Sequence, residues 1–162
     1  MEDGVEQPVL AVEVHIIQVS SVGGRLASVG LGAYQSEQWA VGGISSVLAQ
    51  EVAPLGITVA VPEPGGMRTD WAGSSMAIPP ASAPYHQTVG ERAWMIRAGI
   101  STLASDPAKV AQVVLSVAAM DEPPLRLMLG RDAYRCGTAA GQALAASDAT
   151  AAELNPLGTA DA

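Results

Sequence analysis

The sequence predicts an α/β fold in which helices cover both faces of an incomplete parallel sheet of about three strands. Three short apolar runs bounded by turn formers, at residues 16–19, 57–61 and 125–129, are typical of buried parallel strands. Helical periodicities lie between these runs, and such alternation is the pattern of right-handed βαβ units. We therefore expect the strands to lie side by side in chain order, with the helix after Tyr34 on one face and the helix after Asp106 on the other.

The first long helix is predicted from about Ala33 until Pro54 and Gly56 end it. Two glycines inside it, Gly42 and Gly43, each cost about 1 kcal/mol relative to alanine, so we expect them to mark a close packing contact. The apolar residues that recur at helical spacing form one face, made of Ala40, Ile44, Val47, Leu48 and Val52.

The clearest helix pattern covers residues 107–118. Asp106 can accept the first free amide hydrogens as a cap, and Pro107 suits the first helical position. The apolar stripe of this helix consists of Val110, Val113, Val114, Val117 and Ala118. A shorter helix is predicted inside the preceding loop, from the spacing of Val89, Ala93, Ile96 and Ile100.

Composition excludes several classes of protein. The net charge of −8 opposes nucleic-acid binding, which needs a basic surface. One cysteine, Cys136, cannot form an internal disulfide, and with two separated histidines it makes no recognisable metal site. The apolar runs are shorter than the roughly 20 residues of a membrane span, and the first residues are acidic, without a signal-peptide core. We expect a soluble cytoplasmic protein.

The domain organisation is predicted as one partial domain at residues 15–136. Residues 1–14 stay unassigned, although "VLAVEV" within them could pair with the edge of the sheet. Residues 137–162 are rich in alanine, and we expect a weakly helical or disordered tail there.

Several motifs follow one another at informative intervals. Ser21 ends the first predicted strand, Tyr34 follows thirteen residues later, and Gln38 lies one helical turn beyond it. "PEPGGMRT" then follows the second strand. In this order the motifs resemble the short-chain dehydrogenase/reductase family over residues 15–134, in the part of the family fold that contains its last strands. The resemblance implies a Rossmann-like, three-layer α/β/α domain.

The resemblance also implies an activity: hydride transfer between NAD or NADP and an alcohol or carbonyl substrate. Ser21 and Tyr34 match the family's catalytic serine and tyrosine, and Gln38 stands at the position of its catalytic lysine. The residues implied in cofactor binding are Tyr34, Gln38, Pro64, Gly65, Met67 and Thr69. No metal, nucleic acid or membrane partner is implied.

Two departures from the family pattern bear on activity. The Gly-x-x-x-Gly-x-Gly phosphate loop, the Asn-Asn-Ala-Gly stretch and the catalytic asparagine of the family's first half are absent, and Lys109, the only lysine, lies on a different helix. A free phenol has a pKa of about 10, and an ammonium group one turn away favours its anion, whereas Gln38 brings no charge. We therefore expect the chain alone to be inactive.

Three interpretations remain open at this stage. The chain could supply part of an oxidoreductase completed by another chain, act as a non-catalytic interaction or oligomerisation protein, or be a degraded gene fragment. The first predicted strand would have an unpaired apolar edge, which is a template for another chain. We accordingly expect self-association or a partner chain, while the sequence leaves the identity of any substrate open.

Overall fold

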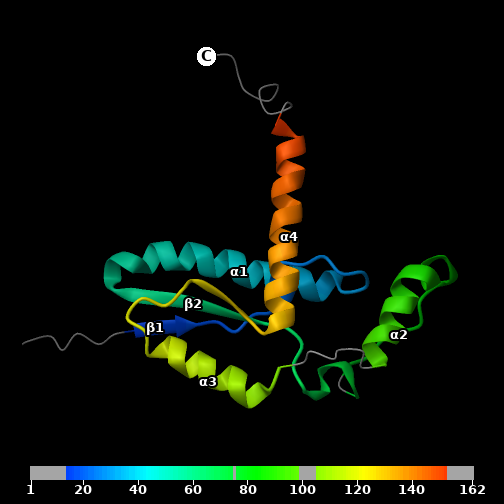
Figure 1. Cartoon of the computed structure of the whole chain (residues 1–162), viewed down its shortest axis with the longest axis horizontal. Coiled ribbons are helices and arrows are strands. Elements are labelled where there is room, and N and C mark those ends of the chain that lie inside the picture. The colour runs from blue at the N-terminus through cyan, green and yellow to red at the C-terminus, as the bar shows by residue number, and fades with distance from the viewer. Residues whose placement is uncertain (1–13, 75, 99–104, 153–162) are drawn as a thin grey trace, which may run out of the picture.

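The computed structural model describes residues 14–74, 76–98 and 105–152. Within them, three parallel strands form one sheet in the order β1 (Val14–Ile17), β2 (Ile57–Pro64) and β3 (Arg126–Leu129). Val14 pairs with Ile57, and Val61 pairs with Arg126. The predicted parallel sheet and its strand order are confirmed (Figure 1). The possible pairing of "VLAVEV" falls almost wholly outside the described residues.

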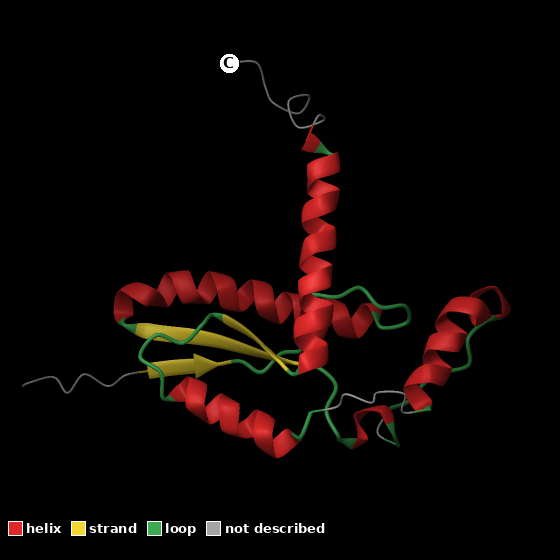
Figure 2. Cartoon of the chain, in the orientation of Figure 1, coloured by secondary structure: helices red, strands yellow, loops and turns green. Residues whose placement is uncertain are grey.

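Two helices cover opposite faces of this sheet, as expected from the two crossover connections (Figures 1 and 2). Helix α1 (Gly32–Val52) lies on one face and α3 (Pro107–Ala118) on the other. Between them β2 is the buried central strand, with Val61 fully inaccessible. The incomplete α/β/α architecture is therefore present in the described chain.

Strand β2 is longer than the sequence predicted, because its prolines do not end it. Pro62 and Pro64 lie inside the strand, where alternate residues bond to opposite neighbours. The amides of Val61 and Gly65 donate to β3, whereas the carbonyl of Pro62 accepts from Ser20 on the β1 side. The amide hydrogens that the prolines lack would point toward that side, so bonds are lost only from the ladder toward β1, while the ladder toward β3 is kept.

The buried face of α1 differs from the predicted apolar stripe. Ile44 and Val47 are 65% and 54% exposed, and they point away from the sheet with Ala40. The residues buried on the opposite side of the helix are Gln35, Gly42 and Ser45. The prediction was wrong because α1 packs through small residues: a methyl group on Gly42 would lie 3.0 Å from the Arg126 guanidinium. Gly43, in contrast, faces open space.

Helix α3 begins as predicted, with the Asp106 carboxylate accepting from the Ala108 amide at 2.9 Å. Its stripe packs on the sheet mainly through Val117. The short helix α2 (Glu91–Arg97) follows one turn of π-helix, η5 (His86–Gly90), and Ile100 lies outside the described residues. The remaining short 3₁₀ turns are η1 (Val22–Gly24), η2 (Ala53–Leu55), η3 (Asp70–Ala72) and η4 (Ala83–Tyr85).

The alanine-rich segment forms a regular helix, α4 (Arg131–Thr150), which stands out from the body of the molecule (Figure 1). Only Ala133 and Gly137, in its first two turns, are buried. Residues 153–162 of the predicted tail lie outside the described residues. Within the described ranges, no helix has the length and apolar character needed to cross a bilayer.

Candidate functional site

Ser21 and Tyr34 meet beside Gly23. A methyl group on Gly23 would lie 3.0 Å from Tyr34 Cε1 and 3.3 Å from Ser21 Oγ, so the two side chains border the same small space. Ser21 caps the turn η1, which follows β1 after residues 18–20, and its Oγ accepts from the Gly23 amide at 3.0 Å. Its hydroxyl hydrogen reaches only the Pro64 carbonyl at 3.5 Å, a weak contact that leaves it free to turn.

Gln38 lies one turn after Tyr34 but bonds the neighbouring serine. Ser20 Oγ donates to Gln38 Oε1 at 2.9 Å, while the Gln35 side chain accepts from the Ser28 amide. The structure therefore brings Ser21 and Tyr34 together and pairs Gln38 with Ser20.

A cavity of about 320 Å³ opens beside Tyr34. Tyr34 forms part of its wall, and the Trp71 ring packs against the tyrosine with centroids 5.6 Å apart. The other walls come from the loop before α1, the segment 76–79 and helix α2. Ser21 and Gln38 are not among its lining residues. The volume falls within the range of small-molecule sites.

The segment after β2 is held by α4 and by the residues before α3. Asp132 Oδ2 accepts from the Gly66 amide at 2.7 Å, and its carboxyl carbon would lie 2.6 Å from a methyl group on Gly65. Met67 forms an isolated parallel β-bridge with Ser105, which precedes α3, and the Thr69 side chain caps η3. Only glycine fits at position 65, because the Asp132 carboxylate occupies the space that a side chain would need.

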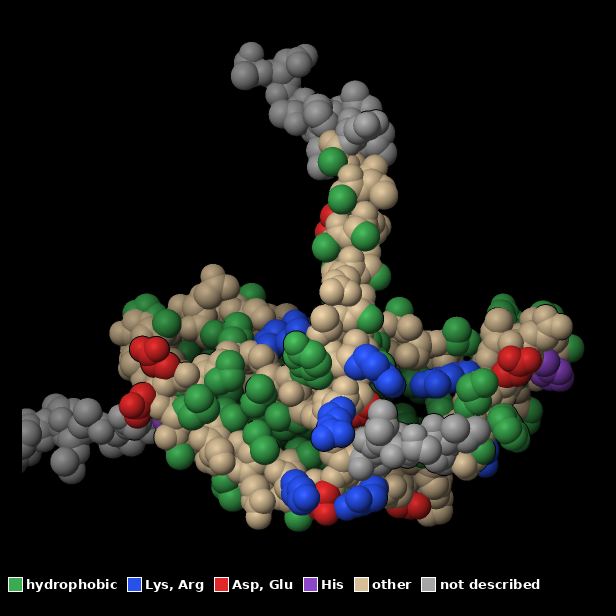
Figure 3. Space-filling view, in the orientation of Figure 1, with side chains coloured by type: hydrophobic (Ala, Val, Ile, Leu, Met, Phe, Trp, Pro, Cys, Tyr) green, Lys and Arg blue, Asp and Glu red, His purple; other side chains and the backbone are tan. Residues whose placement is uncertain are grey.

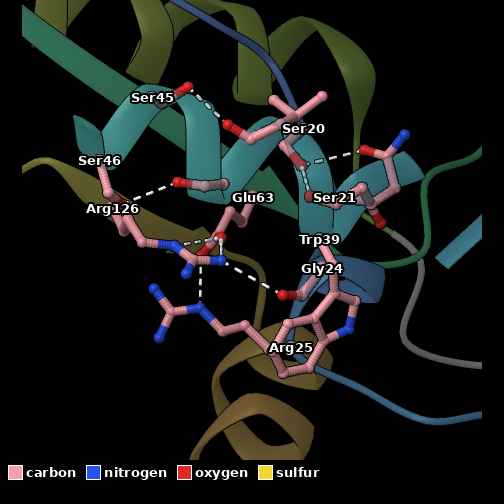
Figure 4. A network of polar contacts seen from close by, with 12 residues as sticks. Ser20, Ser21, Gly24, Arg25, Trp39, Ser45, Ser46, Glu63 and Arg126 are labelled. Carbon is pink, nitrogen blue, oxygen red and sulfur yellow. Dashed lines mark hydrogen bonds and ion pairs between the residues drawn. The ribbon is translucent and has the colours of Figure 1, made fainter. Parts of the chain in front are cut away.

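A buried carboxylate anchors the loop that carries Ser21 (Figure 4). Glu63 on β2 is fully inaccessible and accepts from Arg25 Nε at 2.5 Å and from Arg126 Nε at 2.8 Å, with a second contact to the Arg126 terminal nitrogen. Arg126 also donates to the Gly24 carbonyl at 3.3 Å. We call Arg25, Glu63 and Arg126 the Glu63 cluster. It ties β2 and β3 to the turn after Ser21.

The comparisons with known proteins agree with this architecture. A family model described as short chain dehydrogenase matches residues 11–77. The chain is 54% identical over 141 residues to the oxidoreductase BOA17 of Botryotinia fuckeliana, an alignment that covers 87% of this chain and 52% of that protein. The chain thus spans about half the length of this relative.

Solved structures give the same result. A short-chain dehydrogenase from Streptomyces avermitilis matches with a TM-score of 0.76 and 32% identity, over 88% of this chain and 51% of that one. A short-chain dehydrogenase/reductase from Burkholderia phymatum, solved in complex with NAD, matches with a TM-score of 0.56 and 17% identity, over 71% and 43% of the two chains, and shows the fold alone. These likenesses define a partial Rossmann-like α/β fold. The chain belongs to the short-chain dehydrogenase family.

Sequence reasoning missed two features of the region. The first is the Glu63 cluster, although a glutamate between two prolines at the end of an apolar run could have indicated a buried charge. The second is the part played by Trp71 and Arg92 in lining the cavity. No local pattern predicts it, because the lining residues come from separate segments of the chain.

Proposed function

We propose that this chain carries the catalytic part of an NAD- or NADP-dependent oxidoreductase that interconverts alcohols and carbonyl compounds. The observation that supports it most is the meeting of Ser21 and Tyr34 beside Gly23, next to a cavity of small-molecule size. In this proposal Tyr34 and Ser21 are the catalytic residues.

The two side chains have separate roles in carbonyl reduction. A bound nicotinamide would supply the hydride that adds to the carbonyl carbon. Tyr34 gives its hydroxyl proton to the carbonyl oxygen, so that the product is the neutral alcohol. Ser21 donates a hydrogen bond to the same oxygen, which its weak 3.5 Å contact with Pro64 allows, and thereby stabilises the negative charge that develops there. Alcohol oxidation reverses these transfers.

The candidates for the nicotinamide end of the cofactor are present, although the Asp132 carboxylate fills the space beside Gly65, and the residues do not fit the phosphate end. Gln38 can bond a ribose hydroxyl, and Pro64, Gly65, Met67 and Thr69 are the candidates to border the nicotinamide. The glycines of the turn after β1 offer no space for a pyrophosphate: a methyl group on Gly24 would lie 2.7 Å from the Gln38 carbonyl oxygen. Phosphates are usually held at a strand–helix turn over a helix N-terminus.

We therefore infer that the chain is inactive by itself and that another polypeptide segment must complete the cofactor site. A cytoplasmic location, favoured by composition, belongs to the same proposal. Purified chain should show no NADH- or NADPH-dependent turnover of aromatic ketones, and Gln38→Lys alone should not restore it.

A chimera provides the positive test of the catalytic roles. The chain with Gln38→Lys would be joined to the dinucleotide-binding part of the Streptomyces avermitilis relative. This chimera should reduce ketones, and Tyr34→Phe should lower kcat by at least 100-fold at saturating cofactor, the order of general acid catalysis. A Tyr34→Phe chimera that binds cofactor and keeps its turnover would refute the role of Tyr34.

A second function, self-association, is favoured by the outward face of α1. Ile44, Val47 and Trp39 are exposed there, and Gly43 leaves room for close approach. On the face shown in Figure 3, further hydrophobic side chains gather over the strands between α1 and α3. Large exposed apolar patches mark interaction surfaces. We propose a second copy of this chain as the partner.

Sedimentation velocity can test this second proposal with two matched variants. Ile44→Asp should convert a dimer into a monomer, because a carboxylate would be buried against an apolar surface. Leu115→Asp places the same charge at a residue that is 69% exposed on α3, on the other side of the sheet, and should leave the dimer intact. A wild-type protein that sediments as a monomer would contradict the proposal.

A further inference from the structure

The cavity beside Tyr34 has mostly apolar walls. Its lining includes aromatic rings, aliphatic side chains and Met76, and one charged side chain, that of Arg92. Apolar walls favour an apolar ligand, and the few polar groups in such a cavity set its orientation. Tyr34 and Arg92 are therefore the two groups whose chemistry selects the ligand.

Arg92 lies within the apolar stripe by which α2 and the preceding turn face the cavity. Val89, Arg92, Ala93 and Ile96 line it and follow one another at i, i+3, i+4 and i+7, which is one face of a helix. A guanidinium at such a position interrupts a surface that hydrophobic residues otherwise occupy. Arg97, on the same helix, instead donates to the Ile78 carbonyl at 3.3 Å and supports the opposite wall.

The Arg92 guanidinium has no partner among the described residues: no hydrogen bond or ion pair joins it to them. The nearest acidic residue in sequence, Glu91, borders a shallower neighbouring hollow with Arg92 but forms no salt bridge with it. Two arginines outside the cavity lining are engaged: Arg97 donates to the Ile78 carbonyl, and Arg25 pairs with Glu63. The donors of Arg92 are thus available to a ligand.

A guanidinium beside apolar walls recognises a carboxylate well. Its planar fork matches the two carboxylate oxygens, and a charge-assisted hydrogen bond is stronger than a neutral one. Because Arg92 is exposed, a carboxylate bound to it keeps part of its hydration. The net charge of −8 opposes anions of higher charge, which one arginine would not neutralise.

We propose that this cavity binds an apolar ketone or secondary alcohol that carries one carboxylate, with the oxygen to be reduced or oxidised at Tyr34 and the carboxylate at Arg92. This assignment of substrate class rests on the proposed function for the role of Tyr34. The binding preference itself needs neither cofactor nor turnover, so it can be tested separately.

Isothermal titration calorimetry with two matched ligands tests the proposal. The ligands are 5-oxo-5-phenylpentanoate, an aryl ketone with a carboxylate, and its neutral carboxamide. The wild-type chain should bind the acid about tenfold more tightly than the amide, the order of one charge-assisted hydrogen bond. Rising ionic strength should weaken binding of the acid and leave binding of the amide unchanged.

Three variants complete the experiment. Arg92→Gln should bind acid and amide equally, and Arg92→Lys should keep part of the preference. Lys109→Gln removes the same charge from α3 and should behave as wild type. Equal binding of the two ligands by the wild type, a preference that survives in Arg92→Gln, or no binding of either ligand would each overturn the proposal. An inactive chimera that still prefers the acid would refute the proposed function and leave the binding site intact.

Discussion

Replacing Glu63 by glutamine tests the most strongly buried interaction of the fold. The substitution keeps the shape of the side chain but removes the charge that faces both Arg25 and Arg126. Removing one partner of a buried ion pair costs about 3–5 kcal/mol. Because the two arginine side chains retain 28% and 29% exposure, water compensates them in part, and we expect a loss of about 3 kcal/mol.

Thermal unfolding followed by circular dichroism measures this loss. At roughly 2–4 °C per kcal/mol for a chain of this size, the midpoint should fall by about 10 °C. All samples need one protein concentration, since self-association would shift the midpoint. The control is Arg68→Gln, which removes a surface pair with Asp106 whose side chains are 63% and 36% exposed. The control should cost less than about 0.5 kcal/mol. If Glu63→Gln were as stable as the control, the Glu63 cluster would not anchor the fold.

Two further predictions concern the helices. Gly43→Ala should stabilise the monomer by about 0.5–1 kcal/mol, because a methyl group there meets nothing within 4 Å in its own chain. Gly42→Ala should give no gain, because the methyl group would meet the Arg126 guanidinium. Urea unfolding at a concentration that dissociates the proposed dimer measures both variants, and equal gains would contradict the prediction. Asp106→Ala should cost about 1 kcal/mol by removing the cap of α3, and an unchanged unfolding midpoint would show that the cap is not needed.

The sheet was predictable because its signals are local. Each strand is a short apolar run, and the right-handed crossover rule orders strands that alternate with helices. The start of α3 was equally local, since an aspartate before a proline specifies a cap and a first turn. The neighbouring positions of Ser21 and Tyr34 followed from the family resemblance.

The features that sequence reasoning missed depend on contacts between distant segments. Nothing near α1 shows that Gly42 and Ser45, and not Ile44 and Val47, face the sheet, because the choice depends on how closely Arg126 approaches. Glu63 likewise finds its partners 38 and 63 residues away. The prolines of β2 are tolerated because they face β1, so that the hydrogen bonds from β2 to β3 are kept. The sequence of one strand does not show which neighbour each of its residues faces.

In the function proposed above, this chain holds catalytic side chains but cannot hold a dinucleotide by itself. Calorimetric titration of the isolated chain with NADH and with NADPH tests it most directly. We expect no saturable heat at micromolar cofactor with either dinucleotide. Saturable binding of either one with micromolar affinity would contradict it and would show that the chain provides a phosphate site.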